Sequence, residues 1–348
     1  MSEPLDASSS GNDGDSSFFS VIPIEVLSVI LSFCDQGEIF AGGYRLVCRA
    51  FAEAVPVAWR VTKALNLYAW PPRKRLLRSV LDQSPNATAL TFPLGSPSSL
   101  LEILAPKLGA QFTTLCVPGI KDEDDPDQGL SALLDECTSL TSLDISGIRF
   151  TPAVFEDLPA DRMRQLRVLK LANCPIDDSH KDWLDRCTGL TSLNLSNCTE
   201  LSTEALTEIL EATQQLESLL LYGCTQLEGS IWETMANLGP SLRELDLHST
   251  AISPAQLALL LPAMTALRKL RLSNCPLDGN AVVPCGDLPA IHELHLCSLV
   301  HLHGHHCLAI ARKGRRTLRH LYAYDCGVLR AEDLDGLAEA NPDLTLYM

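Results

Sequence analysis

The sequence predicts an α/β solenoid, a horseshoe with parallel strands on its concave face and helices on its outside. Two observations predict this fold class. A short phrase of alternating leucines recurs eight times from residue 140 onward, as in LTSLNLSNCTEL and LRKLRLSNCPL. Segments that are apolar at helical spacing, such as STEALTEILEATQQ, separate the copies. A fixed period of this kind is typical of stacked structural repeats.

The recurring phrase has the form L-x-x-L-x-L, and successive copies begin 24 to 28 residues apart. This form and period are typical of a leucine-rich repeat that contains a helix. Residues two apart on a strand share a face, so Leu193 and Leu195 are predicted to point into the core together. With two weaker upstream copies, the phrases begin at Ala87, Phe112, Leu140, Leu166, Leu190, Leu216, Leu242, Leu267, Ile291 and Leu318.

The repeats are predicted to stack over residues 61–348, because one repeat cannot bury its own leucines. About ten or eleven repeats are expected. An incomplete first strand is predicted around Leu65 and a last one around Leu346. Ser202 and Ser253 precede two of the apolar segments and are predicted helix N-caps. Gly314, which follows a run of basic residues, is predicted to end a helix.

Composition limits the classes of partner. The net charge is -16 and the pI about 4.9, which disfavours binding to nucleic acid or to an anionic membrane and favours a basic partner. The sequence has no apolar run of membrane-spanning length and no basic-then-apolar leader. Residues 1–17 are acidic and rich in small residues, so we expect them to be disordered.

The cysteines follow the repeat. A set of them occupies one place, three residues after the last strand leucine: Cys174, Cys198, Cys224, Cys275 and Cys326. Equivalent places in stacked repeats lie in the core, where a free thiol behaves as a small apolar group. This pattern requires reduced thiols, and we therefore expect a cytoplasmic location, or a nuclear one as well.

Residues 18–60 lack the repeated leucine phrase and are predicted to form a small all-α domain. Pro23 and Glu25 open an apolar helix, the run Arg45-Leu46-Val47-Cys48-Arg49 is followed by Phe51, and the segment closes on Trp59-Arg60. Two or three helices of this size bury too little surface to be stable alone. In residue types and spacing the segment resembles the F-box family. Together with the repeats, the chain resembles F-box and leucine-rich-repeat proteins.

That resemblance implies a substrate receptor of an SCF-type cullin ubiquitin ligase. The F-box would bind a Skp-type adaptor, and through it a cullin scaffold, while the repeats hold a target protein for ubiquitination. Ubiquitin transfer would take place on other subunits, so the chain itself is expected not to be an enzyme. It is expected to be a monomer outside the complex. The implied adaptor-binding residues are Ile22, Pro23, Leu27, Ile30, Leu31, Leu46, Val47, Phe51 and Trp59.

The concave face is the predicted binding surface for the target. The third, fifth and seventh residues of each phrase point outward, and in the C-terminal half these are aromatic, charged or imidazole side chains. Tyrosine and arginine are frequent anchors of protein interfaces. The predicted target-binding residues are Tyr222, Asp246, His248, Arg271, His295, Tyr322 and Tyr324. The alternative for each of them is an ordinary solvated strand residue.

Catalytic and metal-binding motifs are missing from the sequence. It contains no G-x-G-x-x-G after a strand, no P-loop and no G-x-S-x-G. The histidines between His301 and His306 have no metal-ligand spacing and are interpreted as turn and helix-start residues, so no metal or cofactor is expected. The competing hypothesis is a scaffold or inhibitor whose N-terminal helices only cap the solenoid. An enzyme is the third and least supported class.

Overall fold

The computed structural model describes residues 60, 62–68, 72–120, 125–326 and 336–348, and in these residues one parallel sheet extends from Ala64 to Tyr347. The strands pair in chain order from β1 to β12. They are β1 Ala64–Asn66, β2 Ala89–Thr91, β3 Thr114–Cys116, β4 Ser142–Asp144, β5 Val168–Lys170, β6 Ser192–Asn194, β7 Ser218–Leu220, β8 Glu244–Asp246, β9 Lys269–Arg271, β10 Glu293–His295, β11 His320–Tyr322 and β12 Thr345–Tyr347.

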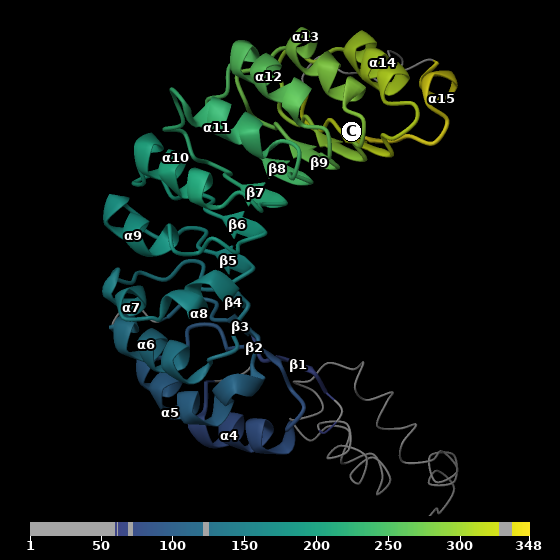
Figure 1. The fold of residues 1–348 in the computed structure, drawn as a ribbon. Helices are drawn as coiled ribbons and strands as arrows, with labels where there is room; N and C mark the ends of the chain where they lie inside the picture. Colours follow the sequence, from purple (N-terminus) through teal and green to yellow (C-terminus); the bar gives the residue numbers. More distant parts are fainter. Residues whose placement is uncertain (1–59, 61, 69–71, 121–124, 327–335) are drawn as a thin grey trace, which may run out of the picture.

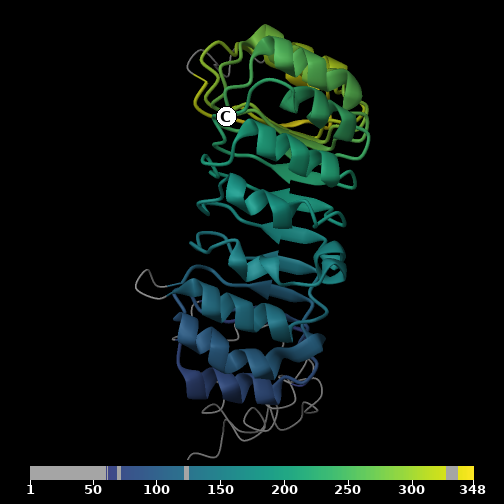
Figure 2. The same ribbon diagram turned by 60° about the vertical axis from the view of Figure 1, so that its left-hand side comes forward.

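The helices form a second layer outside this sheet. Figure 1 shows an arc with the strands along its inner side and the helices along its outer side, and Figure 2 shows the helices stacked in one column. They are α4 Lys74–Gln83, α5 Ser98–Leu108, α6 Pro126–Glu136, α7 Ala153–Glu156, α8 Ala160–Gln165, α9 Lys181–Leu184, α10 Thr203–Ala212, α11 Ile231–Leu238, α12 Pro254–Leu260, α13 Gly279–Val282, α14 Gly304–Lys313 and α15 Leu337–Ala340. Across the described ranges, no helix has the length and apolar character needed to span a membrane.

The register of the sheet places equivalent residues side by side. Leu193 pairs with Leu219, and Asn194 with Leu220. We number the residues of each phrase from its first leucine, so that Leu190 is position 1 and Leu195 is position 6. The N–H at position 6 donates to the carbonyl at position 5 of the following strand, as from Leu195 to Leu220 at 2.9 Å. The same bond recurs along the arc and fixes the register of every position.

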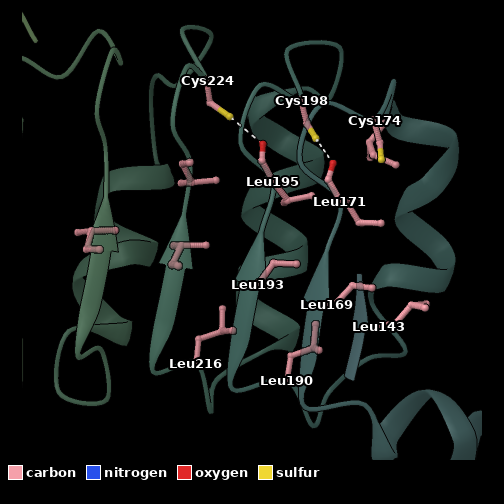
Figure 3. Close-up of a cluster of buried hydrophobic side chains, with 14 of the residues drawn as sticks. Leu143, Leu169, Leu171, Cys174, Leu190, Leu193, Leu195, Cys198, Leu216 and Cys224 are labelled. Atoms are coloured by element: carbon pink, nitrogen blue, oxygen red, sulfur yellow. Dashed lines mark hydrogen bonds between the residues drawn. The ribbon is translucent and has the colours of Figure 1, made fainter. Parts of the chain in front are cut away.

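The strand leucines fill one continuous core. Leu193 and Leu195 are at most 1% exposed, and equivalent leucines of neighbouring repeats lie beside them (Figure 3). The predicted inward direction of positions 1, 4 and 6 is therefore confirmed. In β12, Leu346 is only partly buried, because it lies on the last strand of the sheet.

The cysteines of the repeated place are buried and act as hydrogen-bond donors. The Sγ atom of Cys198 donates to the carbonyl of Leu171 at 3.2 Å, and that of Cys224 to Leu195 at 3.2 Å (Figure 3). Cys275 makes the same bond to Leu247 at 3.0 Å. Burial is the main cause that raises the pKa of the Cys174 and Cys224 thiols to about 11, which keeps them protonated at neutral pH. The predicted core position of this cysteine set is confirmed.

The residue before this cysteine place adopts a left-handed conformation in successive repeats. Gly223 has a φ of 72°, Asn197 of 60° and Ser298 of 55°. The turn leaves no room for a side chain at Gly223, since a Cβ there would lie 2.1 Å from Oδ1 of the Asn197 side chain. Glycine and asparagine adopt this conformation readily, whereas serine is less suited to it. This turn ends each strand and directs the chain toward the outer layer.

The predicted ends of the helices agree with the structure. Ser202 caps α10 by accepting a hydrogen bond from the Ala205 N–H at 3.1 Å, and Ser253 caps α12 in a capping box with Gln256. Gly314 follows α14, whose last turn contains Arg312 and Lys313. These features stabilise helix ends by satisfying backbone groups or complementing the helix dipole.

The described residues contain twelve strands, compared with the ten or eleven repeats expected. β1 is followed by α4, as in a full repeat, whereas β12 is the last described element. Both terminal strands lie where the sequence predicted them. At the N-terminal end, the Asn86 side chain donates to the carbonyl of Arg60 at 2.6 Å. This bond ties Arg60, the last residue of the predicted F-box segment, to the loop before β2.

Candidate functional site

The predicted target-binding residues lie on the concave side or at the adjoining ends of its strands. On β8, Leu245 is 1% exposed, whereas its neighbours Glu244 and Asp246 are only partly buried. Tyr222 and Tyr324, both at position 7, are 39% and 45% exposed. Buried and partly exposed residues alternate along each short strand, and the partly exposed ones supply the side chains of the concave face. The structure does not test whether they bind a target.

Arg271 connects two carboxylates on the concave face. Its Nη1 atom lies 2.8 Å from Oε1 of Glu244 and 3.3 Å from Oδ2 of Asp246. Asp246 and Arg271 are register partners on β8 and β9, which explains their proximity. All three side chains are less than a third exposed, so solvent screens this ion network less than a fully exposed pair.

A second network crosses from β9 to β10. Oε1 of Glu293 lies 2.6 Å from both Lys269 Nζ and His295 Nε2. Burial lowers the pKa of His295 by more than the bond to Glu293 raises it, so the imidazole is neutral at pH 7 and Nε2–H donates. Burial alone would raise the pKa of Glu293, but the hydrogen bonds from Lys269 and His295 hold it below its ordinary value. Glu293 therefore stays ionised.

An aromatic ladder continues the concave face toward the C-terminal end. The rings of His295 and Tyr322 stack with centroids 4.2 Å apart and planes 10° apart, and those of Tyr322 and Tyr347 with centroids 4.4 Å apart and planes 6° apart. All three residues occupy position 5 of in-register strands. Tyr324 tilts against Tyr322 with its centroid 6.3 Å away. We call the side chains of both ion networks and this ladder the concave cluster.

Tyr222 and His248 form a separate pair beside the concave cluster. Their rings meet edge to face with centroids 4.8 Å apart. Both residues occupy position 7, and the Gly223 N–H donates to the His248 carbonyl at 2.9 Å. The structure thus divides the seven predicted residues into two groups: Tyr222 and His248 in this pair, and Asp246, Arg271, His295, Tyr322 and Tyr324 in or against the concave cluster.

The N-terminal half of the concave face has a different character. Its outward strand residues are small, such as Ala64, Ala89, Ser142 and Ser192, and its ion pair is Lys170 with Asp144 at 3.4 Å. Every Asp, Glu, Lys and Arg within strands β1 to β12 takes part in an ion pair. The face is therefore almost neutral, although the chain carries a net charge of -16.

Sequence reasoning missed Tyr347, which is the outer ring of the ladder. Its position in the last phrase, directly after Leu346, is the same as that of Tyr322 after Leu321, and this equivalence could have identified it. Glu244, Lys269 and Glu293 were expected on the concave face but not in the binding set. Their importance comes from contacts with register partners on neighbouring strands.

The predicted adaptor-binding residues, Ile22, Pro23, Leu27, Ile30, Leu31, Leu46, Val47, Phe51 and Trp59, lie outside the described residues. Their role stays a prediction. The histidine run between residues 301 and 306 does start a helix, as predicted. His303 precedes α14, and its N–H donates to Nδ1 of His306 at 3.0 Å. Within the described ranges, no three His, Cys, Asp or Glu side chains are grouped to hold a metal.

Comparison with known proteins supports the fold. No family model and no curated protein matches the chain. One chain of the Rad7 and Elc1 complex from yeast resembles it with a TM-score of 0.58 and 16% identity, covering 93% of this chain and 79% of that one. The chain has the leucine-rich-repeat fold.

Two further solved structures give lower TM-scores. The leucine-rich repeat-containing protein LegL7 from Legionella pneumophila gives a TM-score of 0.46 at 16% identity, covering 88% of this chain and 95% of that chain. Internalin C2 from Listeria monocytogenes gives a TM-score of 0.37 at 20% identity, covering 58% of this chain and 75% of that chain.

Proposed function

We propose that this leucine-rich-repeat protein is the substrate-recognition subunit of an SCF-type cullin ubiquitin ligase. In this proposal, residues 18–60 bind a Skp-type adaptor and the concave cluster binds the target protein. The chain positions the target and contributes no catalytic group. The concave cluster is the main support for target binding, because it brings aromatic and charged side chains together on the concave face.

Two further observations support the first half. The sequence of residues 18–60 resembles the F-box, and the carbonyl of Arg60, at its end, accepts a hydrogen bond from Asn86 in the solenoid. An adaptor bound ahead of Arg60 would therefore be connected to the arc without a long linker. In addition, the yeast structure of similar fold is a complex of two proteins, Rad7 and Elc1. By analogy, we propose a stable protein partner for this chain as well.

Affinity purification from cells tests both halves. We expect the wild-type chain to recover an adaptor, a cullin and the target. Pro23→Ser combined with Leu27→Ser should remove adaptor and cullin together and keep the target. Tyr324→Ser changes an exposed residue of the concave face. It should remove the target and keep the adaptor and the cullin. If wild-type protein recovers a target but no adaptor, the ligase proposal is wrong and the scaffold or inhibitor hypothesis is favoured.

A further inference from the structure

The row of position 7 side chains along the rim of the concave face contains a gap. Its members follow one another through backbone bonds: Ser249 N–H to Ser273, Asn274 N–H to Cys297 and Ser298 N–H to Tyr324, at 2.8 to 3.0 Å. The row therefore reads Tyr222, His248, Ser273, Cys297, Tyr324. Large rings flank two small side chains, Ser273, which is buried, and Cys297, which is partly exposed.

Directly behind the gap, the turns after β9 and β10 enclose an open hollow of about 620 Å³. Asn274 and Ser298, which follow Ser273 and Cys297, belong to its lining. Its walls are partly apolar, since Pro254, Pro276, Leu277 and Val300 contribute to them. Val300 is 70% exposed, so its side chain is accessible to a ligand in the hollow. This volume is within the range of sites that bind small groups.

Two side chains of the hollow, Asn274 and Asp278, offer acceptor oxygens. Oδ1 of Asp278 caps α13 by accepting from the Ala281 N–H at 2.8 Å, while its Oδ2 has no partner within the described part of the chain. Nδ2 of Asn274 donates to Ser249 at 2.9 Å, which leaves its amide oxygen as an acceptor. Among the described residues, no lysine or arginine lines the hollow, whereas the imidazole of His301 does. Asp278 contributes a carboxylate to the lining.

We propose that this hollow binds an arginine side chain of the target protein, which enters from the concave face past Cys297 and Tyr324. The identity of the partner rests on the proposed function. The aliphatic part of the arginine would lie against Leu277 and Val300, and its guanidinium would pair with Oδ2 of Asp278. Electrostatics favours this occupant, because the chain is strongly acidic and the concave cations are already paired with carboxylates.

Arginine matches the hollow better than lysine does. The acceptors come from two elements, the turn containing Asn274 and the residue that caps α13, Asp278. A guanidinium presents five donors in a planar fork and can bond to several separated acceptors, whereas an ammonium is a compact and more strongly hydrated charge. An arginine is also suited to stack on the exposed ring of Tyr324 at the edge of the gap.

A peptide library tests the proposal without the adaptor. The probe is a set of decapeptides in which one position is fixed as arginine, lysine, norleucine or glutamate and the others are randomised. The receptor is the purified full-length chain. We expect arginine at one position to bind about threefold or more tightly than norleucine, as befits an exposed ion pair. The preference should weaken as salt is added.

Asp278→Asn is the decisive variant, because asparagine caps a helix as well as aspartate does and removes only the charge. We expect it to abolish the arginine preference. Val300→Trp should abolish it by filling the hollow. The matched control is Asp343→Asn, which removes another exposed carboxylate, one that lies 3.8 Å from Arg319. It should leave the preference intact.

Three results would overturn the proposal: no arginine preference in the wild type, a preference that survives Asp278→Asn, or an equal loss in Asp343→Asn. The last would indicate general attraction of cations to an acidic protein. Each of these results leaves the adaptor purification unaffected. Failure of this inference and failure of the ligase proposal are therefore distinguishable.

Discussion

The imidazole of His295 lies flat against the ring of Tyr322, with centroids 4.2 Å apart and planes 10° apart. The two residues belong to different repeats, and the parallel register of β10 and β11 places them side by side. The strand spacing of a parallel sheet, about 4.8 Å, is close to the distance at which flat rings stack. The concave cluster is thus a product of register, since equal positions in successive repeats hold groups that attract one another.

Tyr322 is the middle ring of the ladder, and its removal should disturb both neighbours. We expect Tyr322→Ser to lower the free energy of unfolding by about 1–2 kcal/mol, because two stacked pairs are lost. Urea denaturation measures this change. Tyr322→Phe keeps both stacked pairs and should cost much less. Equal losses in the two variants would show that the hydroxyl, rather than stacking, stabilises this region.

Arg271 holds Glu244 and Asp246 together, so its loss should leave two carboxylates in mutual repulsion. We expect Arg271→Met to destabilise the protein by about 1–2 kcal/mol at pH 7. The loss should shrink as salt is added, because dissolved ions screen the repulsion between the two carboxylates. Lys170→Met breaks the more exposed pair with Asp144 and should cost no more than about 0.5 kcal/mol. A cost for Arg271→Met that does not change with salt concentration would contradict this account.

Cys198 should be replaceable by threonine but not by alanine. Alanine removes the Sγ donor to the Leu171 carbonyl and leaves a small cavity, for an expected loss of about 1–2 kcal/mol. Thr250 occupies the equivalent place in its own repeat and donates to a leucine carbonyl there, that of Leu247 at 2.6 Å. Cys198→Thr should therefore lose less than half as much. Thermal unfolding of the two variants under reducing conditions compares them.

The buried thiols predict a loss of stability at alkaline pH. Burial raises the pKa of Cys137 and Cys187 to about 12, and that of Cys224 to about 11. Above about pH 9 the unfolded chain releases these protons and the folded chain retains them, so the free energy of unfolding falls as pH rises. The fall should continue until the folded pKa is reached. Each thiol contributes at most about 1.4 kcal/mol per pH unit.

Urea denaturation at pH 8, 9 and 10 with a reductant checks this prediction. Between pH 6 and 8 these thiols should contribute no slope, because they are protonated in both states. Cys224→Thr removes one titrating group while keeping a hydroxyl donor, and it should make the alkaline fall shallower. If the free energy of unfolding of Cys224→Thr falls with pH as steeply as that of the wild type, then other groups cause the pH dependence.

The fold could be predicted from the sequence because its signal repeats. The inward direction of Leu193, the burial of Cys198 and the caps at Ser202 and Ser253 each depend on local pattern alone. The contacts of the concave cluster depend on which residues are register partners, as Asp246 and Arg271 are. The hollow behind Ser273 and Cys297 arises from the shape of two turns, and no residue type in the sequence indicates it.

The pairing of Ser192 with Ser218 has a consequence for the size of the molecule. Both serines occupy position 3, and the backbone bonds before and after them are of the same kind. Deleting residues 192–217 would join Thr191 to Ser218, so that β7 would lie against β5 in the place of β6. The distance between the two ends of the solenoid could thus shorten in steps of one strand spacing, about 4.8 Å. The residues exposed at each end would stay the same. Evolution or a designer can use that freedom to set how far a bound protein is held from the opposite end.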